Sequence, residues 1–281
     1  MERKNTIFAA VDLGPETEKI LSYSVWLSHT LAEVSPGICI LNVMDYALTP
    51  PAYLLPYMEK EEEAAGYELK RWIDRVKLCG FNATGRIAVG RLIETFSRTM
   101  HDFKVPALVL SHKSHIMRTS ISERLIKSLD VPMLVVRGKK ADNAVLGSVA
   151  IRNVLCAVDF SGHSLKALEF ARTLSEKNSA ALVVTHVLSS LEPDDEQKYL
   201  NHAIQEAEQS MRSTANIPDK AELLVVTGVP YKAINDIASR RNMDLIVIGA
   251  QGMSSTAGVM LGSIAEAIVK SSFCPVMLVR K

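Results

Sequence analysis

The residues whose types and spacing favour chemistry lie in a glycine- and hydroxyl-rich stretch, residues 249–263 (GAQGMSSTAGVMLGS). It follows the apolar run Asp244–Ile248 and leads into the helical pattern Ile264–Ser271. Glycines let a backbone approach an anion closely, and the N–H groups at the start of the following helix, with Ser263 near its cap, favour negative charge. The stretch therefore predicts a phosphate-binding loop, and a Gly/Ser-rich surface turn is the alternative.

A carboxylate, Asp159, ends another apolar run, Val154–Val158. In open parallel sheets, ligands bind beyond the carboxyl ends of the strands, at the point where the strand order reverses. If the strands before Asp159 and Gly249 are neighbours at this point, the carboxylate and the glycine loop face one crevice. Asp159 could then accept hydrogen bonds from a base amine or a sugar hydroxyl, and a helix N-cap or turn role is the alternative.

The elements that must position these residues alternate along the chain. Apolar runs of strand length, rich in Val, Ile and Leu, are separated by amphipathic helical patterns, which predicts the α/β class with parallel strands covered on both faces. The expected strands of the second half are Val154–Val158, Ala181–Val187, Glu222–Val226, Leu245–Ile248 and Val276–Val279. The expected strands of the first half are Ile7–Val11, Ile38–Val43, Thr84–Ala88, Leu108–Leu110 and Met133–Val136. Its helices are expected near Glu16–Glu33, Met58–Lys77, Leu92–His101 and Ser120–Leu129, with an extended loop at Leu48–Tyr57.

The two halves repeat each other. TIFAAVD at residues 6–12 returns as VLCAVD at 154–159, and VPMLVVR at 131–137 returns as CPVMLVR at 274–280. A repeat this long is a duplicated domain, because solenoid units run to about 20–50 residues. We expect one domain at residues 1–140 and a second at 150–281, separated by the polar stretch Gly138–Ser148.

Composition limits the partners. Lys and Arg number 32 against 31 Asp and Glu, so the chain lacks the charge excess of a protein that binds nucleic acid or an anionic membrane. No apolar run is long enough to cross a membrane or to serve as a secretory signal, and the expected place is the cytoplasm.

Neither the cysteines nor the histidines have the spacing of a metal site. The four cysteines form no C-x-x-C pair and are expected to be reduced thiols used as small apolar residues. His112 and His115, with His101 upstream, could converge, but no carboxylate or cysteine of matching spacing joins them, and we expect solvated loop histidines.

The long glycine pattern, Gly249-x2-Gly252-x9-Gly262-Ser263, resembles the nucleotide-binding signature of the universal stress protein family. Other landmarks of that family follow the same order along the chain. They are VDFS at 158–161, HV at 186–187, Gly228-x-Pro230 and CPV at 274–276.

The resemblance implies two tandem open-sheet domains of the adenine nucleotide alpha hydrolase-like type. Each would hold a five-stranded parallel sheet with helices on both faces, and the domains would pair through Met133–Val136 and Val276–Val279 about a pseudo-two-fold axis. It also implies ATP, alone or with Mg²⁺, at the switch point. Ala157, Asp159 and Val187 would surround the adenine, Gly249 and Ala250 would lie by the ribose, and Gly252, Gly262, Ser263 and Ile264 would hold the phosphates.

The first half departs from this pattern. Counting back from the proline before the last strand, Thr119-Ser120 stands where the second half has Gly262-Ser263, and Ser111 stands where it has Gly249. The connecting loop is shorter and contains no glycine, although Asp12 is kept. We expect that this domain does not bind ATP in the family manner, and whether the loop Ser111–His115 takes another anion is left open.

No catalytic residue is expected. The chain has no Gly-x4-Gly-Lys-Ser/Thr loop and no Gly-x-Ser-x-Gly elbow, and the phosphate loop contains no Arg or Lys. We favour a nucleotide-binding regulatory protein of the stress response. A slow ATPase or phosphotransferase and an interaction module with a vestigial site are the alternatives. The sequence leaves open the protein partner and whether two chains form a homodimer.

Overall fold

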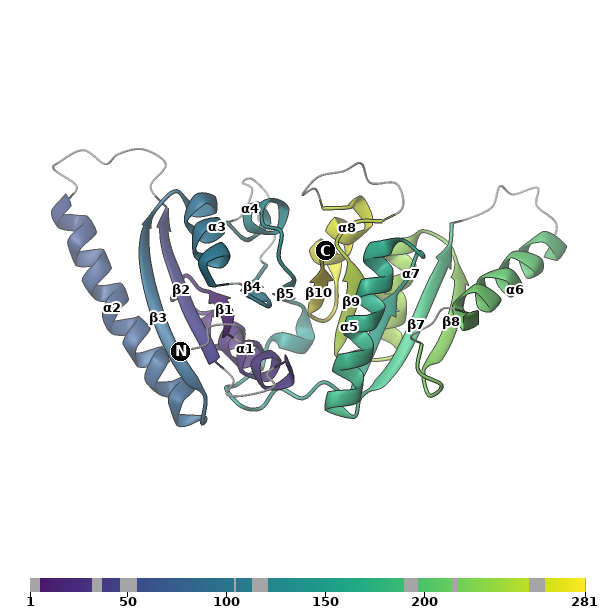
Figure 1. Cartoon of the computed structure of the whole chain (residues 1–281), viewed down its shortest axis with the longest axis horizontal. Coiled ribbons are helices and arrows are strands. Elements are labelled where there is room, and N and C mark those ends of the chain that lie inside the picture. Colours follow the sequence, from purple (N-terminus) through teal and green to yellow (C-terminus); the bar gives the residue numbers. More distant parts are fainter. Residues whose placement is uncertain are drawn as a thin grey trace. The chain divides into compact units, whose positions relative to one another are not determined.

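The structure is a computed structural model in which residues 6–31, 37–45, 55–103, 105–112, 121–189, 197–213, 217–252 and 261–280 are described. The chain divides into two compact units, which are described separately below. Unit 1 is formed by residues 1–136 and 143–149, and unit 2 by residues 137–142 and 150–281. Each unit contains parallel strands connected by helices (Figure 1).

In unit 1 the strands lie in the order β3-β2-β1-β4-β5, so the order reverses beside β1. The strands are β1 Thr6–Ala10, β2 Gly37–Asp45, β3 Asn82–Gly90, β4 Leu108–Ser111 and β5 Met133–Val136. The helices are α1 Thr17–Leu31, α2 Leu55–Leu78, α3 Leu92–Phe103 and α4 Ile121–Ser128.

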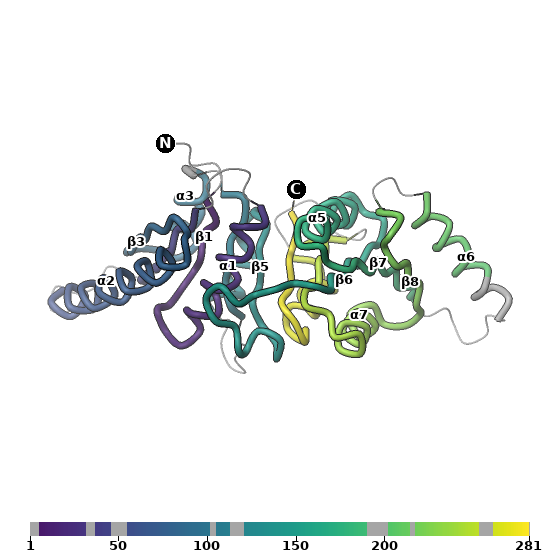
Figure 2. The backbone as a smooth tube through the Cα atoms, turned by 90° about the horizontal axis from the view of Figure 1, so that it is seen from below, coloured from purple at the N-terminus to yellow at the C-terminus, as the bar shows by residue number. Residues whose placement is uncertain are grey.

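Unit 2 repeats this topology as β8-β7-β6-β9-β10. Helices α5 and α7 lie on opposite faces of its sheet (Figure 2). The strands are β6 Asn153–Ala157, β7 Ala181–Leu188, β8 Glu222–Thr227, β9 Leu245–Gly249 and β10 Val276–Val279. The helices are α5 Gly162–Asn178, α6 Gln197–Ser213, α7 Pro230–Arg240 and α8 Ser263–Ser271.

The central strands explain why the apolar runs are continuous rather than alternating. In unit 2, Leu155 and Val247 are fully buried, as are Phe8 and Val109 in unit 1. A strand covered by helices on both faces has no solvated side, so each of its positions takes an apolar residue. The predicted α/β class with parallel strands is confirmed.

Two expectations need correction. Helix α2 begins at Leu55, so the predicted extended loop ends before Tyr57, and the part of that loop at residues 48–54 lies outside the described residues. Cys79 is exposed and does not serve as an apolar core residue. Cys39, Cys156 and Cys274 are buried, and this burial raises the pKa of all three thiols, to about 12 for Cys274.

The segment that follows β5 packs on unit 2. A Cβ atom on Gly138, whose φ is +78°, would lie 2.1 Å from the carbonyl oxygen of Phe273, so only glycine fits this crossing. Lys140 pairs with Asp244 at 2.8 Å, and the other carboxylate oxygen of Asp244 accepts the backbone N–H of Arg152 at 3.0 Å. One carboxylate thus holds both ends of the segment between β5 and β6. The sequence-based division placed residues up to 140 in the first domain, and that division stays a prediction.

Among the described residues, no helix is long and apolar enough to cross a membrane.

Candidate functional site

The two predicted site segments leave neighbouring strands of unit 2. Strand β6 pairs with β9, with Ala157 opposite Ile248, and the strand order reverses between these two strands. Asp159 therefore follows β6 at the same sheet edge at which Gly249 ends β9. The neighbourhood that the sequence analysis assumed for these strands is confirmed.

Asp159 shapes the turn between β6 and α5. Its Oδ1 atom accepts the N–H of Ser161 at 3.1 Å, and its own N–H donates to the Ser164 hydroxyl at 3.2 Å. Phe160, which lies between Asp159 and Ser161, has a left-handed backbone conformation with φ +63°. The N-cap of α5 is Ser161, whose hydroxyl accepts the Ser164 N–H, so Asp159 is a turn residue and not the cap.

The second carboxylate oxygen of Asp159 lies against the glycine loop. A Cβ atom added to Gly252 would lie 2.6 Å from Asp159 Oδ2, closer than real side chains approach. The loop backbone comes this near to the carboxylate because residue 252 has no side chain. The structure thus brings together Asp159 and Gly252, which are far apart in the sequence.

The two ends of the loop also meet. The N–H of Gly262 donates to the carbonyl of Ala250 at 2.8 Å. The N–H of Ala250 donates to the carbonyl of Val279 on β10 at 2.9 Å. Gly249 packs on the first turn of α5, where an added Cβ would lie 2.9 Å from the backbone nitrogen of Ser164. Residues 253–260, between these ends, lie outside the described residues.

Helix α8 presents its N-terminus at this loop. Its N-cap is Gly262, and no side chain of the described residues caps it, whereas α5 is capped by Ser161. Ser263 and Ile264, the first residues of α8, are exposed. The partial positive charge of this helix end is therefore not neutralised by a side-chain cap.

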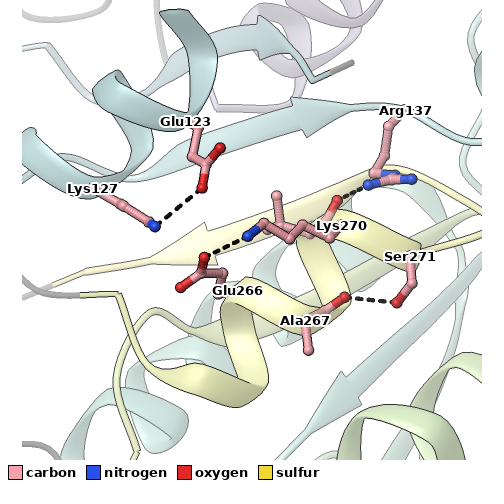
Figure 3. A network of polar contacts seen from close by, with 8 residues as sticks. Glu123, Lys127, Arg137, Glu266, Ala267, Lys270 and Ser271 are labelled. Carbon is pink, nitrogen blue, oxygen red and sulfur yellow. Dashed lines mark hydrogen bonds and ion pairs between the residues drawn. The ribbon is translucent and has the colours of Figure 1, made fainter. Parts of the chain in front are cut away.

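The remainder of α8 is held by ordinary polar contacts (Figure 3). Glu266 pairs with Lys270 at 2.7 Å, and Arg137 donates to the carbonyl of Val269 near the helix C-terminus. A cation at that end complements the helix dipole. Burial lowers the pKa of Arg137, which is far above neutrality in any environment.

Ala157 and Val187 line one face of the sheet. Ala157 pairs with Thr185, and Val187 lies two residues further along β7 on the same side. Both side chains are half-buried. A Cβ atom on Gly249 would point toward α5, so the side chain of the preceding residue, Ile248, points to the other face of the sheet. Ala157 is paired with Ile248 and therefore lies on the face away from α5.

Unit 1 repeats the turn that follows the first strand. Asp12 Oδ1 accepts the N–H of Gly14 at 2.9 Å, and Leu13 between them is left-handed, with φ +59°. The carboxylate turn is therefore the same as in unit 2. Of the loop that follows β4, residues 113–120 lie outside the described residues.

An ion pair joins β2 to α4 in unit 1. Arg124 donates to Asp45 Oδ2 at 2.9 Å, while Oδ1 accepts the N–H of Leu92 at the start of α3. Leu41 pairs with Ala10, so Asp45, four residues further along β2, leaves the same face as Ala10. The pair therefore joins the carboxyl end of β2 to α4 on that face of the sheet. The counterparts in unit 2, Ser189 and Ala267, carry no charge.

His112 occupies the position that Ala250 has in unit 2. Its N–H donates to Val136, as that of Ala250 donates to Val279, and its ring is buried with Nδ1 at 3.3 Å from the Ser122 hydroxyl. The expectation of a solvated loop histidine is wrong for His112, because the ring packs under α4. His115 lies outside the described residues, and within the described part of the chain no three His, Cys, Asp or Glu side chains could hold a metal ion.

Sequence reasoning missed three residues that shape these edges. Asp45 and Arg124 come from segments distant in sequence, and no local pattern marks their pairing. His186 was noticed only as part of a landmark, although its ring contacts the Asp159 turn. The cap of α5 had a local signal, Ser161-x-x-Ser164, that a search for helix starts would find.

A parallel sheet whose strand order reverses between β6 and β9, with helices on both faces, defines a doubly wound α/β protein. Residues 150–280 match the model of the universal stress protein family. A Thermus aquaticus protein, "Universal stress protein in QAH/OAS sulfhydrylase 3'region", is 30% identical over 140 residues, which cover 46% of this chain and 98% of that protein. Universal stress protein YxiE of Bacillus subtilis is 31% identical over 144 residues, covering 45% and 97%. The chain belongs to the universal stress protein family.

Solved structures match the fold over the whole length. A universal stress protein from Archaeoglobus fulgidus has a TM-score of 0.72 with 22% identity, covering 99% of this chain and 98% of that one. A putative universal stress protein from Pseudomonas aeruginosa has a TM-score of 0.69 with 15% identity, covering 98% and 92%. At these identities the likeness concerns the fold alone.

Proposed function

We propose that this protein is a cytoplasmic regulator of the stress response that binds ATP in unit 2 and does not turn it over efficiently. Family membership supports the general role, and the residues at the switch point support the ligand. ATP occupancy would change the surface of unit 2 that a protein partner contacts.

One observation carries the proposal. The two ends of the glycine loop meet through the Gly262–Ala250 hydrogen bond, beside both the Asp159 carboxylate and the uncapped N-terminus of α8. A negative carboxylate and a positive helix end thus flank one loop. ATP has complementary ends, because its phosphates suit the helix N-terminus and its sugar and base supply hydrogen-bond donors for a carboxylate.

The residues present fit such a ligand. The approach of residue 252 to Asp159 leaves no room for a side chain, which is typical of a cradle formed by backbone. We assign Gly252, Gly262, Ser263 and Ile264 to the phosphates and Gly249 and Ala250 to the ribose. Ala157, Asp159 and Val187 are assigned to the adenine, since Ala157 and Val187 offer half-buried apolar surface on one face.

The same residues favour binding over turnover. Residues 249–263 contain no Arg or Lys that could stabilise a transferring phosphoryl group. No cluster of metal ligands exists among the described residues, so a Mg²⁺ ion would be held chiefly by the phosphates of ATP. We therefore assign no catalytic residue.

Unit 1 is proposed not to bind ATP in this manner. Its loop after β4 contains no glycine, His112 stands at the position of Ala250, and the Asp45–Arg124 pair joins β2 to α4. These contacts place the protein's own side chains where unit 2 has small uncharged residues.

Calorimetric titration of the full-length protein with ATP tests the proposal. Ser263→Glu adds a negative charge to the first turn of α8, where acidic residues stabilise a helix but repel phosphate. We expect at least a tenfold loss of ATP affinity with no loss of thermal stability. Ile121→Glu, which adds the same charge to the first turn of α4 in unit 1, is the matched control and should bind as the original chain does.

A wild-type protein without measurable ATP binding would refute the proposal and favour an interaction module with a vestigial site. A single-turnover assay that shows rapid hydrolysis, lost in Ser263→Glu, would favour an ATPase instead. Mass spectrometry of small molecules retained through gentle purification identifies the natural nucleotide.

A further inference from the structure

His186 lies at the candidate site without belonging to the loop or to the assigned ligand residues. It precedes Val187 on β7, so its side chain leaves the opposite face of that strand, toward α5. Because Val187 is assigned to the adenine face, His186 points away from the ligand. Any influence of His186 on binding must therefore pass through other residues.

The His186 ring holds both neighbours of Asp159. Its Nδ1 atom donates to the carbonyl of Val158, the residue before Asp159, over 2.7 Å. The ring also lies against Phe160, the residue after Asp159, with centroids 4.8 Å apart and planes inclined by 43°. Asp159 is thus fixed from both sides by one side chain.

These contacts of His186 hold a backbone segment in an uncommon conformation. Phe160 has φ +63°, a left-handed conformation that residues other than glycine and asparagine seldom adopt. Such a residue persists only where its surroundings enforce the conformation. If the Val158–Asp159 peptide rotated, the carboxylate would move away from Gly252, which it now approaches closely.

Unit 1 contains a partial equivalent. Asn42 occupies the position of His186 in the repeat and donates from Nδ2 to the carbonyl of Val11 at 2.9 Å, the residue before Asp12. The next residue after Asp12 is Leu13, which is left-handed like Phe160 but has no ring to stack with. Both units therefore hold the carbonyl before the aspartate, and only unit 2 adds the ring contact.

We propose that His186 is a positioning residue that sets the Asp159 carboxylate for the nucleotide through the Val158 carbonyl and the Phe160 ring. The proposal rests on the proposed ATP site of unit 2. It assigns to His186 no contact with the ligand. We call the group formed by His186, Val158 and Phe160 the clamp.

Three substitutions separate the two parts of the clamp. His186→Phe keeps a ring beside Phe160 but has no donor, His186→Asn keeps a donor of the kind that Asn42 supplies, and His186→Ala removes both. Asn42→Ala deletes the corresponding hydrogen bond in unit 1 and serves as the control. ATP affinity is measured by calorimetry on the full-length protein, together with thermal stability.

We expect His186→Ala to bind ATP about tenfold more weakly, the effect of losing one partly buried hydrogen bond that preorganises the site. His186→Phe should lose most of this affinity, and His186→Asn should recover most of it. Asn42→Ala should lower stability but leave ATP affinity unchanged. If His186→Phe and His186→Ala bind ATP like the original chain, the proposal is wrong.

A second readout needs no nucleotide. The N–H of Asp159 and that of Ser161 are both hydrogen-bonded within the turn, so their exchange with solvent reports its rigidity. We expect exchange about tenfold faster in His186→Phe than in His186→Asn. Equal exchange in both variants would overturn the clamp. Absence of ATP binding by the unmodified protein would instead refute the proposed function and leave this comparison valid.

Discussion

The turn after the first strand is the same in the two units, while the loop after the fourth strand differs. Asp12 and Asp159 each accept an N–H two residues ahead, and each is followed by a left-handed residue. Beyond this turn, Asp159 faces Gly252 in unit 2, whereas in unit 1 the Asp45–Arg124 pair joins β2 to α4. An aspartate at this edge is therefore explained by the turn alone, and our proposal for the ligand site depends on the glycines that only the second unit has in its loop.

Other features of the two units correspond closely. Glu123–Lys127 on α4 and Glu266–Lys270 on α8 are ion pairs of the same spacing at matching positions, 3.1 and 2.7 Å long (Figure 3). Helices α4 and α8, which follow the fourth strand of each unit, thus have an ion pair at the same place on their surfaces. The units differ elsewhere as well, since α2 has 24 residues and the corresponding α6 has 17.

Removal of each aspartate gives the largest expected effect. Asp159→Ala and Asp12→Ala each delete one turn hydrogen bond and should each cost about 1 kcal/mol of stability. Asp159→Ala should in addition weaken ATP binding about a hundredfold, equivalent to about 2.7 kcal/mol, because a charged acceptor is lost. Calorimetry measures both variants. Equal ATP affinities in the two would contradict the assignment of the ligand to unit 2.

Gly249→Ala tests the close packing of the loop on α5. The added Cβ would lie 2.9 Å from the backbone of His163 and Ser164, and backbone yields less readily than a side chain. Such overpacking should cost unit 2 about 2 kcal/mol of its free energy of unfolding. Hydrogen exchange resolves the units separately. The converse change, Ser111→Gly, should alter unit 1 by less than about 1 kcal/mol, and a larger effect there would show that the two positions are not equivalent.

Alkaline pH should affect unit 2 through Cys156, whose counterpart in unit 1 is Ala9. Burial raises the pKa of this thiol above its ordinary 9.0, so above pH 9 the unfolded chain ionises while the folded one does not. Stability is therefore unchanged below pH 9 and falls above it, by about 1.4 kcal/mol near pH 10. Urea denaturation of Cys156→Ala should show a shallower decline between pH 9 and 11. A parallel decline in both proteins would exclude this cause.

The Asp45–Arg124 pair should have the smallest effect. Its side chains are 20% and 45% exposed, so solvent screens the attraction, and a double-mutant cycle should give a coupling of about 0.5 kcal/mol that decreases in high salt. Removing both charges should not create ATP binding in unit 1, because its loop still lacks glycine. A gain of affinity in Asp45→Ser with Arg124→Ala would show that the pair alone closes the crevice.

Much of the fold was readable from the sequence. Continuous apolar runs extend from Val154 to Ala157 and from Leu245 to Ile248, which is typical of buried parallel strands, and the repeated aspartate and proline landmarks set the two halves in register. The glycine loop was also recognised locally, because glycines between an apolar strand and a helix start are typical of a backbone that approaches an anion. The burial of the His112 ring was not predictable from the sequence, because it depends on how α4 packs against the sheet.

The sequence by itself determined the order of strands and helices, because hydrophobic periodicity and glycine positions act over a few residues. Only the tertiary structure decided which residues from distant strands and helices contact one another. The approach of Gly252 to Asp159, the clamp on Asp159 by His186, and the Asp45–Arg124 pair each join segments far apart in the chain. Such contacts depend on the relative positions of whole strands and helices, which no local pattern encodes.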